Sequence, residues 1–199
     1  VFRIRISNSV HYLVSQIVEF IIQNWHIFIS SFGIISSIEL GGFVRIKNIF
    51  SQIFAPFSKI ISIFVASKFE INNKILLIFV ALPALMFVFI SSMHSIFSDS
   101  IYDLLPDSWI IIREYFNLAL LMSLLIAFSR FFLRYMFNDD IGLKLNTKIK
   151  SIMLIALVLI SVIMMETLNL VMVVYLISLI YFISIVLSYA HLSLKKAKS

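Results

Sequence analysis

The chain has 199 residues, of which 61% are hydrophobic and only 13% are charged. A typical soluble domain is about 45–50% apolar and about 25% charged, so a soluble fold of this size could not bury so much apolar surface. The same figures exclude an intrinsically disordered chain. The sequence contains no cysteine, which excludes disulfides, iron–sulfur ligation and a cysteine nucleophile. The composition therefore predicts an integral membrane protein.

The charges, which sum to +6, sit in blocks between the apolar runs. Residues 43–74, residues 130–150 and the C-terminal tail are mainly basic, whereas residues 99–107 carry only acidic charges. Such segregation is what the positive-inside rule produces in membrane proteins. Nucleic-acid binding would instead need basic residues interleaved with aromatic ones on a water-exposed face, and we exclude it. We treat residues 1–199 as a single membrane domain.

Two helices are predicted within residues 1–74. Residues 10–36 are apolar with scattered polar positions, which predicts either a partly polar span or a helix packed on other membrane helices. Residues 43–69 place apolar side chains on one face and lysines and serines on the other. Such an amphipathic helix is typical of the membrane interface, and a span packed against partners is the alternative. Pro56 is expected to kink it.

The next apolar run, residues 75–97, carries no charged residue and is long enough to cross about 30 Å of hydrocarbon. Pro83 is tolerable within such a transmembrane helix. The sequence therefore predicts its clearest membrane span here.

Two over-long apolar runs follow, at residues 109–145 and 151–192. As single helices they would be roughly 55 Å and 60 Å long, too long to cross a bilayer upright. Either each run breaks into two pieces or both helices lie strongly tilted. Because no Gly or Pro interrupts residues 151–192, we favour two long, strongly tilted helices over residues 109–192. The predicted fold is an all-α polytopic membrane protein with about five or six helices.

Arg134 and Glu166 are charges in apolar surroundings. A guanidinium in hydrocarbon costs at least about 2.5–3.5 kcal/mol, so Arg134 is either a functional membrane charge or part of a charged loop over residues 130–150. Glu166 is a lone carboxylate in a long apolar run, which by default indicates a functional site such as a proton relay. A snorkelling or hydrogen-bonded neutral carboxyl is the alternative. Asn169, three residues on, is expected on the same helix face.

The residues around Arg134 form a recognisable pattern. Ser123-Leu124-Leu125 is followed by eight residues and then Arg134, with Asn138 and Gly142 four and eight positions further on. Steps of four place the last three along one helix stripe. The pattern resembles the signature of subunit a, the proton-channel subunit of rotary F-type ATP synthases. That family shows S-L-L, eight residues, then R-x-x-x-N-x-x-x-G, usually with a leucine such as Leu133 before the arginine.

The resemblance covers about residues 113–192 and implies a proton-translocating stator subunit without catalytic activity, cofactor or metal. Its implied partners are the c-ring subunits, other Fo stator and peripheral-stalk subunits, and membrane lipids. The implied location is the mitochondrial inner membrane, with the bacterial plasma membrane as the alternative. The chain departs from the family at Leu143, where His or Glu is usual, and at Val173 and Val174, where a glutamine is expected.

The resemblance also implies roles for individual residues. Arg134 would face the c-ring and separate two aqueous half-channels, and Asn138 would help to position it. Glu166 and Asn169 would line one half-channel. Gly142, Tyr175 and His191 are secondary candidates for the proton path, whereas Asp139 and Asp140 are expected to be solvated. Two other functions stay open: an accessory structural membrane subunit of a large respiratory complex, and a small carrier or channel.

Overall fold

The computed structural model describes residues 2–33, 35–66, 73–103, 110–136 and 139–196, and every regular element in these ranges is a helix. The prediction of an all-α fold is confirmed. The helices within these ranges are α1 (Phe2–Gln23), α2 (Trp25–Ser30), α3 (Ser37–Ala66), α4 (Asn73–Tyr102), α5 (Ile110–Tyr135), α6 (Asp140–Ile163) and α7 (Leu170–Lys196).

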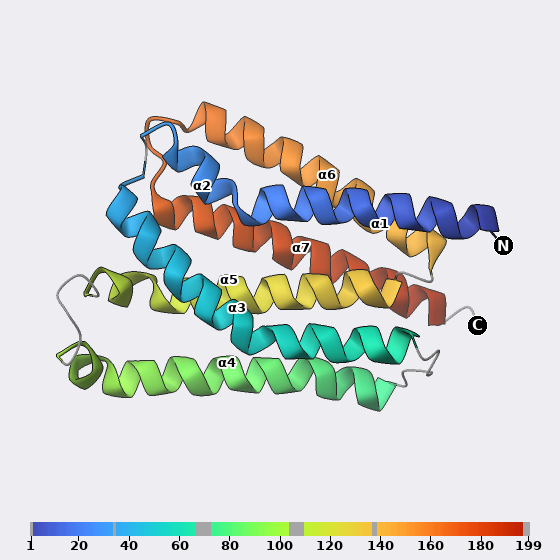
Figure 1. Cartoon of the computed structure of the whole chain (residues 1–199), viewed down its shortest axis with the longest axis horizontal. Coiled ribbons are helices and arrows are strands. Elements are labelled where there is room, and N and C mark those ends of the chain that lie inside the picture. Colours follow the sequence, from blue (N-terminus) through green and yellow to red (C-terminus); the bar gives the residue numbers. More distant parts are fainter. Residues whose placement is uncertain (1, 34, 67–72, 104–109, 137–138, 197–199) are drawn as a thin grey trace.

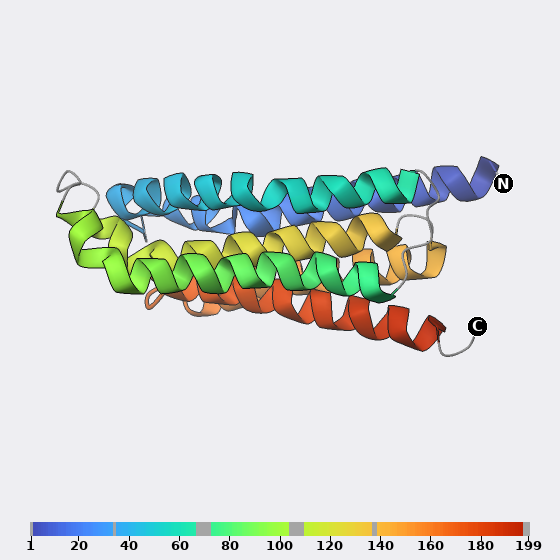
Figure 2. The same ribbon diagram turned by 90° about the horizontal axis from the view of Figure 1, so that it is seen from below.

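The long helices lie side by side in one elongated bundle, and consecutive long helices run in opposite directions (Figure 1). The view from below shows the same bundle edge-on (Figure 2). Both chain termini lie at one end, which we call the terminal end; it also holds the end of α5 and the start of α6. We call the other end the turn end, because it holds the α6–α7 turn at Met164–Asn169.

Four of the described helices are long and apolar enough to cross a membrane. The candidate spans are Val80–Ser100 in α4, Arg113–Arg134 in α5, Ile141–Ile163 in α6 and Leu170–His191 in α7. The first of these overlaps the span predicted at residues 75–97. The chain is therefore an all-α integral membrane protein, as the composition predicted.

The core of the bundle lies around α5, the most buried of the candidate spans. Ala119, Leu120 and Leu133 of α5 are fully buried. The apolar face of α3, including Phe43 and Phe54, is buried as well, and α3 makes its main packing contact with α5. The helix therefore packs on α5, as the alternative expected, but it is not among the candidate spans that the described residues contain.

The proline in α3 lies inside a continuous helix, and α3 changes direction along its length (Figure 1). Pro56 has no backbone N–H, so the carbonyl of Gln52 loses its intrahelical partner and the helix can bend there. The expected kink agrees with this change of direction.

The prediction of two long tilted helices over residues 109–192 was wrong, because this region forms three helices, α5, α6 and α7. The turn between α6 and α7 contains no Gly or Pro. Instead the hydroxyl of Thr167 donates to the Met164 carbonyl at 3.1 Å, and the side chain of Asn169 accepts from the Met172 N–H at 2.9 Å. Such short polar side chains satisfy the free backbone groups at helix ends, which is why an apolar run can turn back here.

Candidate functional site

Arg134 lies in the last turn of α5, at the terminal end of its candidate span. Its side chain is partly buried, and its guanidinium donates a hydrogen bond to the backbone carbonyl of Ser58 on α3. The arginine therefore ties the end of α5 to α3. Asn138, which was expected to position Arg134, lies outside the described residues.

Glu166 is exposed in the α6–α7 turn, so the expectation of a carboxylate buried within a membrane helix was wrong. Asn169 is also exposed and caps the start of α7. The two residues do not share a helix face, because the chain is not helical between them. The same turn that breaks the predicted long helix removes Glu166 from the apolar interior.

The structure does not bring Arg134 and Glu166 together. Arg134 lies next to the start of α6 in the chain, whereas Glu166 follows the end of α6. A helix of 24 residues separates these two ends by about 36 Å. Tyr175, a secondary candidate, is exposed on the outer side of α7.

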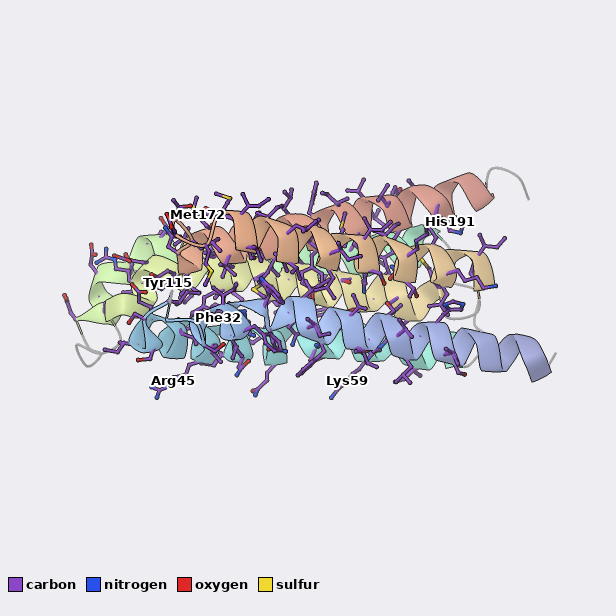
Figure 3. All side chains as sticks on the ribbon, turned by 90° about the horizontal axis from the view of Figure 1, so that it is seen from above. Phe32, Arg45, Lys59, Tyr115, Met172 and His191 are labelled. Atoms are coloured by element: carbon purple, nitrogen blue, oxygen red, sulfur yellow. The ribbon has the colours of Figure 1, made fainter. Side chains whose placement is uncertain are left out.

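Two other predicted residues, Gly142 and His191, lie close together, and Asp139 lies beside both. His191 Nε2 lies 3.1 Å from Asp139 Oδ2, and both side chains are largely buried, so the expectation of a solvated Asp139 was wrong. A Cβ at Gly142 would lie 2.8 Å from Asp139 Oδ2 and 3.1 Å from His191 Nε2. Only glycine leaves room for this contact. Figure 3 shows His191 near the terminal end, far along α7 from Met172.

The sequence analysis missed a buried ionic centre formed by Glu19 of α1, Lys150 of α6 and Arg130 of α5. Lys150 Nζ lies 2.6 Å from Glu19 Oε2, and their side chains are only 1% and 3% exposed. Arg130 Nε lies 3.4 Å from the other carboxylate oxygen, and its guanidinium also donates to Gln23 Oε1 at 2.7 Å. One carboxylate is thus held between two cations from different helices.

The ionic centre lies near the middle of the candidate spans of α6 and α7, whereas Arg130 lies four positions before the end of the α5 span. Lys150 is nine positions after Ile141 in the α6 span, about 14 Å along the helix. Tyr181, whose hydroxyl donates to the Glu19 carbonyl at 3.3 Å, lies halfway along the α7 span. Charges at this depth are costly and, where they occur, mark substrate, ion or proton pathways by default.

Polar side chains continue from the ionic centre toward the terminal end between α1, α6 and α7. On α7 they recur every three or four positions, which places them on one helix face. We call this set the polar seam; its members are Ser15, Glu19, Asp139, Asn146, Lys150, Ser178, Tyr181, Ser184, Ser188 and His191. Its inner members are buried, although most other residues of α7 before His191 are apolar.

Asn146 connects the three helices of the seam one helical turn from Lys150. Its amide donates to Ser188 Oγ of α7 at 3.1 Å, and its carbonyl oxygen accepts from Ser15 Oγ of α1 at 3.3 Å. The Asp139–His191 pair lies further toward the terminal end, about one helical turn beyond Ser188 on α7. The seam therefore places proton donors and acceptors in successive layers, from the largely buried imidazole of His191 to the buried carboxylate of Glu19.

The seam offers proton donors and acceptors rather than metal ligands. Among the residues that the structure describes, no group of three or more His, Cys, Asp or Glu side chains is placed to hold a metal ion. Comparison with known proteins adds no assignment: no family model, no curated protein and no solved structure matches this chain.

Proposed function

We propose that this membrane protein translocates protons through its helix bundle along the polar seam, with Glu19 as the proton-binding carboxylate. One observation carries the proposal: the Glu19–Lys150 ion pair is buried at 2.6 Å near the middle of the candidate spans. A buried ionisable pair at this depth, one helical turn from a row of hydroxyl, amide and imidazole groups, is the arrangement expected of a membrane proton relay.

The contacts suggest how a proton is passed. The carboxylate of Glu19 holds Lys150 and Arg130, so a proton that binds Glu19 weakens both contacts and frees the cations to change partners. Serine hydroxyls, such as that of Ser188, can accept one proton and donate another, which lets them carry a proton between layers. The Asp139–His191 pair is the member of the seam nearest to water at the terminal end.

The orientation follows from the charges at the two ends of the bundle. Lysines lie at the terminal end. Lys144 and Lys148 are exposed in the first turns of α6, and the last turn of α7 contains Lys195 and Lys196 in its sequence. The turn end holds exposed carboxylates, including Asp99 and Glu166, beside the arginines Arg45 and Arg113. By the positive-inside rule, the terminal end faces the cytoplasm or the mitochondrial matrix.

A narrower proposal follows from the sequence pattern around Arg134: the chain is a divergent subunit a of an F-type ATP synthase in the mitochondrial inner membrane. Its partners would be the c-ring and the other Fo and peripheral-stalk subunits. The Ser123–Gly142 spacing supports this proposal. Under it, Arg134→Ala abolishes coupled proton transport but leaves assembly intact, and normal ATP-driven pumping by that variant would contradict it.

Proton flux into liposomes tests the broader proposal. The protein is purified in mild detergent with the partners that it retains and reconstituted with a trapped pH-sensitive dye under a potassium diffusion potential. We expect Glu19→Gln to lower the flux by about 10²-fold, a typical contribution of a positioned acid–base group. Glu166→Gln, which alters the exposed turn, is the matched control and should leave the flux unchanged.

A second variant guards against a folding defect in Glu19→Gln. Ser188→Ala leaves the ion pair intact and removes only the hydroxyl that accepts from Asn146. It should slow the flux while the protein stays folded. Equal fluxes for wild type, Glu19→Gln and Ser188→Ala would contradict the proposal. That result would favour the other candidate, an accessory structural subunit in which the doubly paired Glu19 fixes the helix register.

A further inference from the structure

A second pair of titratable side chains, Lys47 of α3 and His26 of α2, lies apart from the polar seam. Lys47 Nζ is 3.4 Å from His26 Nε2, and the two residues are 3% and 0% exposed. The His26 ring packs edge-on against Phe43, with the ring centroids 5.3 Å apart. His26 Nδ1 has no hydrogen-bond partner among the described residues. Both residues are outside the four candidate spans.

The surroundings of Lys47 disfavour its charged form. Within the described residues, Lys47 forms no ion pair with a carboxylate, and the charge that acts on it from α5 is the positive one of Arg130. A buried ammonium without a counter-ion is costly. Burial, helped by Arg130, lowers the pKa of Lys47 to about 8. Burial, helped by Lys47, lowers the pKa of His26 to about 3.

We propose that Lys47 and His26 together bind one exchangeable proton and form a second, separate proton-binding site of this protein. In the protonated state the Lys47 ammonium donates to the unprotonated Nε2 of His26. When the proton leaves to solvent, the imidazole shifts its hydrogen from Nδ1 to Nε2 and donates to the neutral amine. The protonated state consists of one ammonium and one neutral imidazole. The deprotonated state consists of a neutral amine and a neutral imidazole, with the proton released to solvent.

The groups that face this pair come from α5 and α3. Arg130 on α5 contributes a fixed positive charge, and the Ser123 hydroxyl donates to the backbone carbonyl of Lys47 at 3.1 Å, not to its amine. Phe43 on α3 covers the imidazole. The site is defined by equilibrium proton binding, so it stands whether or not the chain conducts protons.

The pH dependence of unfolding in detergent tests this site. An unfolded lysine has a pKa of about 10.4, so above pH 8 the unfolded chain binds more protons at Lys47 than the folded one. Stability from this residue therefore rises with pH between about 8 and 10.4. We expect the melting temperature of the wild type to rise by several degrees relative to Lys47→Met over this interval. Lys148→Met, at an exposed position, is the matched control and should follow the wild type.

Nitrogen-15 spectra of the histidine rings keep the test decisive if Lys47→Met fails to fold. In the wild type, His26 should change from the Nδ1–H to the Nε2–H form near pH 8, and His26→Phe identifies its signals. Unfolding curves of wild type and Lys47→Met that stay parallel from pH 7 to 10 would overturn the proposal. A His26 ring whose signals do not change over that range would overturn it as well.

Discussion

The ion pair between Glu19 and Lys150 makes a quantitative prediction. Lys150→Met removes the cation that lies 2.6 Å from Glu19 Oε2 and leaves the buried carboxylate with Arg130 alone. Arg130 lies farther away, at 3.4 Å, and its side chain is 36% exposed, so water screens its charge. Removal of one partner of a buried pair typically costs about 3–5 kcal/mol. We expect a loss in the free energy of unfolding within this range.

The matched double variant separates the pair from its parts. Glu19→Leu combined with Lys150→Met replaces both charges by apolar side chains of similar volume, and such replacements are often neutral or stabilising by about 1–4 kcal/mol. The double variant should therefore be more stable than Lys150→Met. Lys148→Met, an exposed lysine of the same helix, should change stability by no more than about 0.5 kcal/mol.

The assay is reversible unfolding in mixed detergent micelles, monitored by helical circular dichroism. It compares the wild type, the control Lys148→Met, the two single variants Glu19→Leu and Lys150→Met, and the double variant that combines them. If Lys150→Met lowers the free energy of unfolding by less than about 1 kcal/mol, the claim that Lys150 stabilises a buried Glu19 carboxylate is refuted. If the costs of the two single variants simply add in the double variant, the two residues are not coupled, and the ionic centre does not exist as described.

Three further predictions concern the seam and the turn. Gly142→Ala should displace Asp139 from His191, because the new methyl group would lie 2.8 Å from Asp139 Oδ2. We expect this variant to conduct protons more slowly, and a flux equal to that of the wild type would refute the prediction. Asn146→Leu removes the contacts with Ser188 and Ser15 and should lower the flux with the ion pair intact, which a flux assay checks. Asn169→Ala removes the cap of α7 and should cost about 1 kcal/mol in thermal unfolding; no shift would argue against this cap.

Composition and apolar periodicity were enough to predict the fold class and the approximate place of a membrane span at residues 75–97. These features depend on local properties, because a helix in hydrocarbon must satisfy its own backbone groups and expose apolar side chains. The candidate span in α4, Val80–Ser100, begins five positions later than the apolar run. The amphipathic pattern of residues 43–69 likewise identified α3, but not its packing partner α5. Its two faces were predicted only in part, because Lys47 and Ser58 of the expected polar face are buried and Ile49 of the expected apolar face is exposed.

The break between α6 and α7 could not be found from the usual Gly and Pro signals. Thr167 and Asn169 end one helix and start the next with side-chain hydrogen bonds inside an apolar run. Such residues are also tolerated within helices, so their presence alone does not decide the structure. The polar Glu166-Thr167-x-Asn169 cluster was the available signal, and reading it as a turn would have placed Glu166 at the surface.

The ionic centre could not be predicted because its partners are 131 residues apart in the chain. Residues 130–150 looked like an ordinary basic loop, and Lys150 was grouped with it. The available signal was the helical spacing of Leu145, Ile149 and Ile152, which indicates that Lys150 lies inside a helix. The pairing of Lys150 with Glu19 depends on how α1 packs against α6, which no local pattern determines.

Infrared difference spectroscopy of the membrane-embedded protein tests the central claim most directly. A pH jump that protonates Glu19 should produce the carbonyl stretching band of a buried carboxylic acid, and this band should be absent from Glu19→Gln and unchanged in Glu166→Gln. A difference spectrum that is the same in wild type and Glu19→Gln would show that Glu19 does not bind the proton, and would contradict the proposed path through the seam.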